Sequence, residues 1–116
     1  MERRSEERYQ VQFGAKVTVA GDRGLSAVGR VSDISNSGIN VGLPFELAAG
    51  EVVEIEIADS TLYGLVIYSR RDNSVFHTGI ELIQVVLGTT EESGVLQKVL
   101  IETTPEIPGL EPISAG

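Results

Sequence analysis

Arginines gather at the N-terminal end of the chain, where Arg3, Arg4 and Arg8 lie within the first eight residues. Arg4 and Arg8 are four residues apart, so they face the same side of either a helix or an extended arm. A guanidinium group offers a planar fork of donors that matches phosphate oxygens, and its flat face can stack on a purine base. The alternative is a solvated helix in which Arg3 pairs with Glu7. Both interpretations stay open on this segment alone.

A second polar cluster consists of Asp33, Ser35, Asn36, Ser37 and Gly38. Asp33 and Ser35 are two apart, so in a strand they face the same side. A carboxylate can accept hydrogen bonds from the N1 and N2 donors of guanine, and a hydroxyl can donate to a phosphate or base acceptor. Gly38 permits a positive φ or a close approach of a ligand to the backbone. The alternative is a hairpin turn whose polar side chains bond their own backbone.

The elements that must position these residues are expected to be strands. Between residues 9 and 86, apolar and polar residues alternate in short stretches with turn residues between them. The expected strands cover about residues 11–19, 27–34, 39–43, 51–57, 62–69 and 75–83. Six strands about 10 residues apart, with no helix between them, favour an antiparallel barrel or sandwich. A barrel is preferred because closure removes the exposed sheet edges. The fold class is therefore an all-β, six-stranded antiparallel β-barrel.

The turns and the C-terminal part complete the expected organisation. Turns are predicted at residues 21–24 and 70–74, the second containing Arg70 and Arg71. A short helix is predicted within residues 87–102, capped by Thr89 or Thr90, with one apolar face that covers a barrel opening or packs on a partner chain. Residues 103–116 hold three of the four prolines and are predicted to be a disordered tail.

Composition excludes several functions. A chain of 116 residues builds one domain whose core must rest on Val, Ile and Leu, because aromatics are few. Cysteine is absent and His77 is the sole histidine, so no metal site and no cofactor are expected. The net charge of −8 repels a nucleic acid polymer, although a small anion could still bind where positive charge gathers. No apolar run approaches the roughly 20 residues needed for membrane insertion, and a cytoplasmic location is the default.

The two clusters and the strand pattern together resemble the PilZ domain family. The resemblance covers about residues 3–83: an R-x-x-x-R pair before the first strand, D-x-S-x-x-G at the second hairpin, and a closing strand that contains Gly79-Ile80-Glu81-Leu82. It implies a barrel that binds cyclic di-GMP. Arg4 and Arg8 would grip phosphates and stack on guanine, while Asp33, Ser35 and Gly38 would form the barrel side. Arg3 would imply that an intercalated ligand dimer binds.

Further residues are weaker candidates for the same site. The resemblance allows one of Arg70 and Arg71, of which Arg70 is the candidate, to reach a second phosphate, although an exposed turn is the alternative. His77 and Gly79 lie on the last predicted strand, where His77 could line the guanine pocket or remain an ordinary surface or rim residue. Asn36 and Ser37 belong to the turn of the second cluster.

The function expected from these observations is that of a non-catalytic receptor or adaptor. Ligand binding would fold the arm at residues 1–8 onto the barrel and present a new surface to a downstream protein partner. The alternative is a PilZ-like protein-interaction module that does not bind nucleotide. An enzyme is not expected, because serine catalysis would require His77 as base and nothing in the sequence places a serine and a carboxylate around it.

Overall fold

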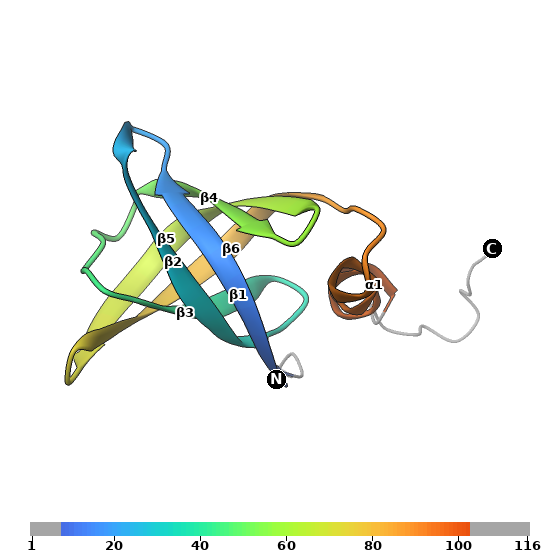
Figure 1. Ribbon diagram of the computed structural model, residues 1–116. Coiled ribbons are helices and arrows are strands. Elements are labelled where there is room, and N and C mark those ends of the chain that lie inside the picture. Colours follow the sequence, from blue (N-terminus) through green and yellow to red (C-terminus); the bar gives the residue numbers. More distant parts are fainter. Residues whose placement is uncertain (1–7, 103–116) are drawn as a thin grey trace, which may run out of the picture.

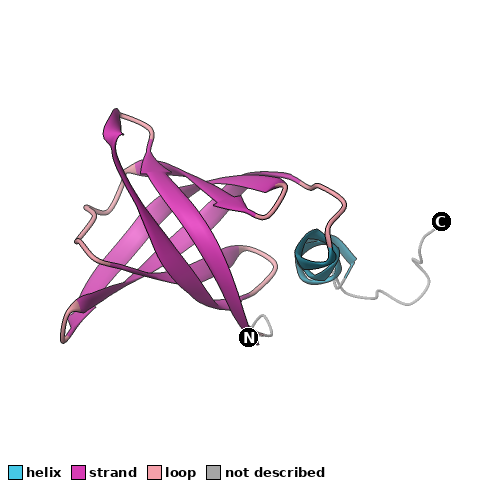
Figure 2. Ribbon diagram, viewed as in Figure 1, coloured by secondary structure: helices cyan, strands magenta, loops and turns pink. Residues whose placement is uncertain are grey.

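The structure is a computed structural model that describes residues 8–102, apart from the side chains of residues 22–24 and 102. Residues 1–7 of the predicted arm and the predicted tail at residues 103–116 lie outside this description. Six antiparallel strands close into a barrel in the order β1-β2-β3-β6-β5-β4 (Figures 1 and 2). They are β1 (Tyr9–Val19), β2 (Asp22–Ile34), β3 (Gly38–Leu43), β4 (Val52–Ile57), β5 (Ser60–Asp72) and β6 (Val75–Val86). The predicted barrel is confirmed.

The barrel interior is filled by the inward-facing residues of the alternating pattern. In β4, for example, Val53, Ile55 and Ile57 are buried, whereas Glu56 between them is exposed. Among the described residues, the buried apolar side chains are all Val, Ile or Leu except Ala15. Removing this apolar surface from water is the main force that closes the barrel.

Strands β3 and β4 follow each other in the sequence but do not pair in the barrel, so the connection between them must cross over its end. Leu47 in this connection is buried in the core, so residues 44–51 cover the barrel interior where β3 ends. Closure then comes from the pairing of β4 with β1, from Lys16 opposite Glu56 to Val19 opposite Val53.

The C-terminal part packs on the barrel beside the β4–β5 hairpin (Figure 1). It consists of the helix α1 (Glu91–Gln97) and a π-helical turn (Lys98–Glu102). Thr90 caps α1 by accepting a hydrogen bond from the backbone N–H of Ser93, which agrees with one of the two predicted caps. Leu96, Val99 and Leu100 are buried in the core. The predicted short C-terminal helix is therefore confirmed, and its apolar face covers the barrel.

Two hairpins are tighter than predicted. The turn expected at residues 21–24 is shorter, because β2 already begins at Asp22, which pairs with the last residue of β1. The turn expected at residues 70–74 is reduced to two residues, because Asn73 adopts the left-handed conformation (φ 61°). Asparagine tolerates this conformation, so two residues suffice to reverse the chain. The prediction that Arg70 and Arg71 lie in the turn of this hairpin is wrong, because both belong to β5.

Candidate ligand-binding site

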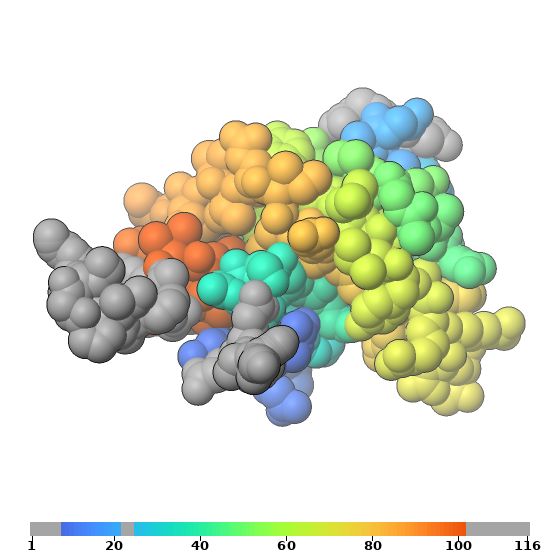
Figure 3. Space-filling view, turned by 180° about the vertical axis from the view of Figure 1, so that it is seen from behind, coloured from blue at the N-terminus to red at the C-terminus, as the bar shows by residue number. Residues whose placement is uncertain are grey.

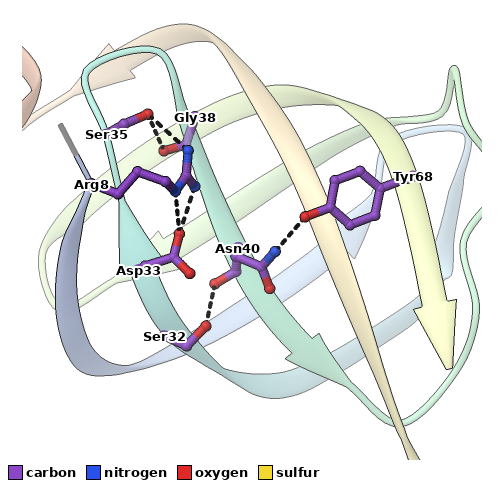
Figure 4. Close-up of polar contacts among 7 residues, drawn as sticks. All are labelled: Arg8, Ser32, Asp33, Ser35, Gly38, Asn40 and Tyr68. Atoms are coloured by element: carbon purple, nitrogen blue, oxygen red, sulfur yellow. Dashed lines mark hydrogen bonds and ion pairs between the residues drawn. The ribbon is translucent and has the colours of Figure 1, made fainter. Parts of the chain in front are cut away.

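Arg8 meets Asp33 at the start of the barrel. Arg8 directly precedes β1, and Gln10 at the beginning of β1 pairs with Asp33 near the end of β2, which brings the two side chains together. The Arg8 Nε and Nη2 groups both donate to Oδ1 of Asp33, at 2.8 and 2.5 Å (Figure 4). The two residues are 25 positions apart in the sequence, and the pairing of β1 with β2 brings them together in space.

A β-bulge in β2 directs Asp33 outward. Val31 pairs with Val41 and Asp33 with Asn40, so Ser32 is an extra residue on the β2 side. Such an extra residue shifts the alternation of side chains by one position. As a result Asp33 is partly exposed and can reach Arg8, whereas the next residue, Ile34, is buried in the core.

Ser35 and Gly38 shape the turn between β2 and β3. The backbone N–H of Ser35 donates to the carbonyl oxygen of Gly38 at 2.8 Å, and the Ser35 hydroxyl donates to the same oxygen at 3.4 Å. That buried hydroxyl also accepts from Nη1 of Arg8 at 3.4 Å. Gly38 does not have a positive φ. Glycine is needed at this position because the backbone of β6 is close: a Cβ atom on residue 38 would lie 2.8 Å from the carbonyl oxygen of Ile80.

Asn40 and Tyr68 lie across the outer face of the barrel from Arg8. The Asn40 Nδ2 group, on β3, donates to the hydroxyl of Tyr68, on β5, at 2.7 Å (Figure 4). The Arg70 guanidinium lies 5.8 Å from the centre of the Tyr68 ring. Neither Asn40 nor Tyr68 was predicted from the sequence as a site residue. Asn40 had one signal, a polar residue between the core-facing Ile39 and Val41, but such positions are common on barrel surfaces.

These residues line a single open groove of about 430 Å³. Its lining includes Arg8, Asp33, Ser35, Ser37, Gly38, Asn40, Tyr68, Arg70, Gly79 and Glu81. The space-filling view shows this region, where the β2–β3 turn meets β6 (Figure 3). The groove thus combines two guanidinium groups, two carboxylates, hydroxyls and an aromatic ring, a set of groups that could bind a planar, anionic ligand.

The structure brings together most of the predicted site residues that it describes. Asn36 is exposed in the turn but is not part of the groove lining. His77 faces Asp72 instead, with 3.4 Å between Nε2 and Oδ2, and lines a separate, more apolar hollow beside Val75. The structure therefore places His77 on the surface outside the groove, which agrees with the alternative of an ordinary surface residue. Arg3 and Arg4 lie outside the described residues.

A separate group of polar residues around Asp59 joins the C-terminal helix to the β4–β5 hairpin. Asp59 accepts hydrogen bonds from the Ser93 hydroxyl at 2.7 Å, from the backbone N–H of Thr89 at 2.7 Å and from the Thr90 hydroxyl at 2.8 Å. These donors, the Ser93 hydroxyl first, hold the pKa of Asp59 well below its usual range. The hydroxyls of Ser60 and Ser93 also bond to each other in a buried position.

Within residues 8–102, no group of histidine, cysteine and carboxylate side chains is arranged to bind a metal ion. No helix in this part of the chain is long and apolar enough to cross a bilayer.

The chain is thus a small closed-barrel domain with an open groove on its outer face. The sequence model of the PilZ domain matches residues 2–92, so the chain belongs to the PilZ domain family. No curated protein sequence matches the chain.

Two solved structures share the fold. The first is the inhibitor of motility MotI/DgrA of Bacillus subtilis, with a TM-score of 0.63 and 14% identity over 89% of this chain. The alignment spans 52% of that protein, so the chain corresponds to about half of its length. The second is the PilZ domain of CeSA from a cellulose-synthesizing bacterium, with a TM-score of 0.53 and 22% identity. It covers 80% of this chain and 94% of that domain.

Proposed function

We propose that this chain binds cyclic di-GMP in the groove and acts as a non-catalytic receptor or adaptor. The meeting of Arg8, Asp33 and Ser35 supports the proposal most directly, because strand pairing and a bulge combine to assemble it. Membership of the PilZ family supports the choice of ligand. A location in the cytoplasm, where such a messenger would be encountered, belongs to the same proposal.

Each residue of the cluster has a part in binding. Asp33 holds Arg8 through Nε and Nη2, which orients the guanidinium plane at the edge of the groove. A guanidinium held in this way can donate to a phosphate oxygen and stack on a guanine base. Asp33 can also accept from the N1 and N2 donors of guanine. Arg4 would add a second guanidinium from the arm.

The expected affinity follows from the kind of contact. Charge-assisted hydrogen bonds contribute about 1.5–3 kcal/mol each. Four or five such bonds, reduced by the entropy of association and of ordering the arm, leave a dissociation constant on the order of 1 μM. Binding would bring the arm onto the groove and change the surface offered to a protein partner.

Isothermal titration of cyclic di-GMP tests the proposal. Arg4→Ala and Arg8→Ala should each weaken binding at least tenfold, because each removes charge-assisted bonds to phosphate. Arg71→Ala is the matched control: its guanidinium lies over the Phe76 ring and it does not line the groove. That variant should bind as the wild type does.

Two results would contradict the proposal. Unchanged affinity of Arg8→Ala would show that the cluster is not the site. No heat of binding by the wild-type chain would favour the alternative of a protein-interaction module that does not bind nucleotide.

A further inference from the structure

The ring of Tyr68 occupies the space that a side chain at Gly79 would fill. A Cβ atom at Gly79 would lie 2.3 Å from Cε2 and 2.6 Å from Cζ of Tyr68. Because residue 79 on β6 is glycine, the ring of Tyr68 on β5 can lie against the backbone of β6. Tyr68 is 42% exposed, so the position of its ring is not enforced by burial in the core.

The hydroxyl of Tyr68 is fixed from a third strand. Asn40 on β3 donates to it at 2.7 Å (Figure 4). Tyr68 is thus held by its own strand β5, by Gly79 on β6 and by Asn40 on β3. Three separate strands restrict a half-exposed aromatic side chain, which leaves the ring little freedom to change its orientation.

Arg70 lies next to this ring. Residues 68 and 70 project from the same face of β5, and the Arg70 guanidinium is 5.8 Å from the ring centre. A cation over an aromatic face is attracted to it, and the contact restricts where the guanidinium can lie. Tyr68 and Arg70 both line the groove that Arg8 also lines, and Figure 4 shows Tyr68 on the opposite side of Asn40 from Arg8.

We infer that Tyr68 is a positioning residue for Arg70, and that Arg70 forms a second cationic wall of the groove that Arg8 also lines. This inference rests on the proposed function. Two guanidinium groups that line one groove, one held by Asp33 and one by Tyr68, suit a ligand with two separate phosphates. A cyclic dinucleotide has two such groups, whereas cyclic GMP has one and can engage only one wall at a time.

Dissociation constants of four variants for cyclic di-GMP test the inference. Arg70→Ala and Tyr68→Ala should each weaken binding about tenfold. The double variant should be no weaker than Arg70→Ala alone, because the ring acts through the arginine. Tyr68→Phe keeps the ring but loses the bond from Asn40, so its affinity should fall less than that of Tyr68→Ala.

Two further measurements separate positioning from a structural role. Arg70→Ala should reduce the preference for cyclic di-GMP over cyclic GMP, because only the ligand with two phosphates loses a contact. A general loss of structure would weaken both ligands alike. The Arg71→Ala control removes the same charge from the adjacent position, where the guanidinium lies over Phe76, and should leave this preference unchanged.

Several outcomes would overturn the inference. Wild-type affinity in both Tyr68→Ala and Arg70→Ala, together with a loss in Arg8→Ala, would show that Arg70 does not contact the ligand. The proposed function would then still stand. Additive losses in the double variant would show that the ring acts independently of Arg70. Absence of binding by the wild-type chain would overturn the proposed function, and this inference with it.

Discussion

At Gly38 the backbone of β3 passes so close to β6 that a Cβ atom would lie 2.8 Å from the carbonyl oxygen of Ile80. Because this oxygen belongs to the backbone of a core strand, it cannot move away as a flexible side chain would. Gly38→Ala should therefore destabilise the barrel by about 1–3 kcal/mol in urea unfolding. It should also disturb the adjoining turn at Ser35.

Gly14 supplies the matched control for this substitution. It also lies in a strand, but a Cβ atom there would meet nothing within 4 Å. Gly14→Ala should leave stability unchanged or raise it by up to about 1 kcal/mol. Equal stability of the two alanine variants would show that the approach of β3 to β6 does not require glycine.

Arg8 is expected to matter for binding far more than for stability. Its side chain is 50% exposed and that of Asp33 is 29% exposed. Ion pairs in such positions contribute about 0–1 kcal/mol to folding. The Arg8→Ala variant should consequently remain folded, which makes its ligand affinity a clean measure of the site.

At the scale of elements, Asp59 links the β4–β5 hairpin to the start of α1. Gly88 leaves room for the carboxylate, since a Cβ atom there would overlap it. The Ser93 hydroxyl, the Thr89 backbone N–H and the Thr90 hydroxyl favour the charged form, so the pKa is lowered from 3.8. A carboxylate whose pKa is lower in the folded state stabilises the protein above its unfolded pKa of about 3.9. This contribution is lost as the pH falls toward the folded value.

The prediction for Asp59→Asn concerns melting temperature as a function of pH. At pH 7 the variant should melt below the wild type, because an amide accepts these hydrogen bonds less strongly than a carboxylate. The difference should shrink as the pH falls below about 4, since the unfolded wild-type chain then binds a proton at Asp59 that the folded chain does not. Comparing the two proteins at each pH cancels the titration of the other acidic residues. A difference that stays constant from pH 7 to pH 2 would rule out this role.

At the scale of the whole molecule, the C-terminal helix is part of the barrel core. Leu96 is completely buried and belongs to the same apolar cluster as the strands. Leu96→Ala should lower the free energy of unfolding by about 2–5 kcal/mol. Val95→Ala, at a position 39% exposed, should cost much less. Urea titration followed by circular dichroism checks both. Equal losses would mean that the helix packs only loosely on the barrel.

The net charge of −8 acts against anion binding over the molecule as a whole. Arg8 and Arg70 come from distant parts of the chain to the same groove, which also holds the carboxylates of Asp33 and Glu81. Under the proposed function, these two guanidinium groups would attract the ligand at short range. The attraction between a bound anion and a nearby guanidinium group can outweigh the net charge, since salt ions screen charges that lie more than about 8–10 Å away.

Much of the fold was predictable from local pattern. Alternation of apolar residues has a period of two in any strand, so strand number and the Val, Ile and Leu core follow from the residues themselves. The helix cap at Thr90 is equally local, because a hydroxyl before an acidic first turn suffices. Hairpin lengths were less predictable, since Asn73 shortens one turn through a conformation that many turn residues tolerate.

The sequence by itself therefore determined that this protein is a small β-barrel whose R-x-x-x-R and D-x-S-x-x-G clusters could bind an anionic ligand. Only the tertiary structure decided how Asp33 faces Arg8 and that Tyr68 joins Asn40 and Gly79 in the groove. These contacts depend on the register between strands and on the bulge at Ser32. One extra residue turns a side chain from the core to the surface, and pairing between distant strands fixes that position.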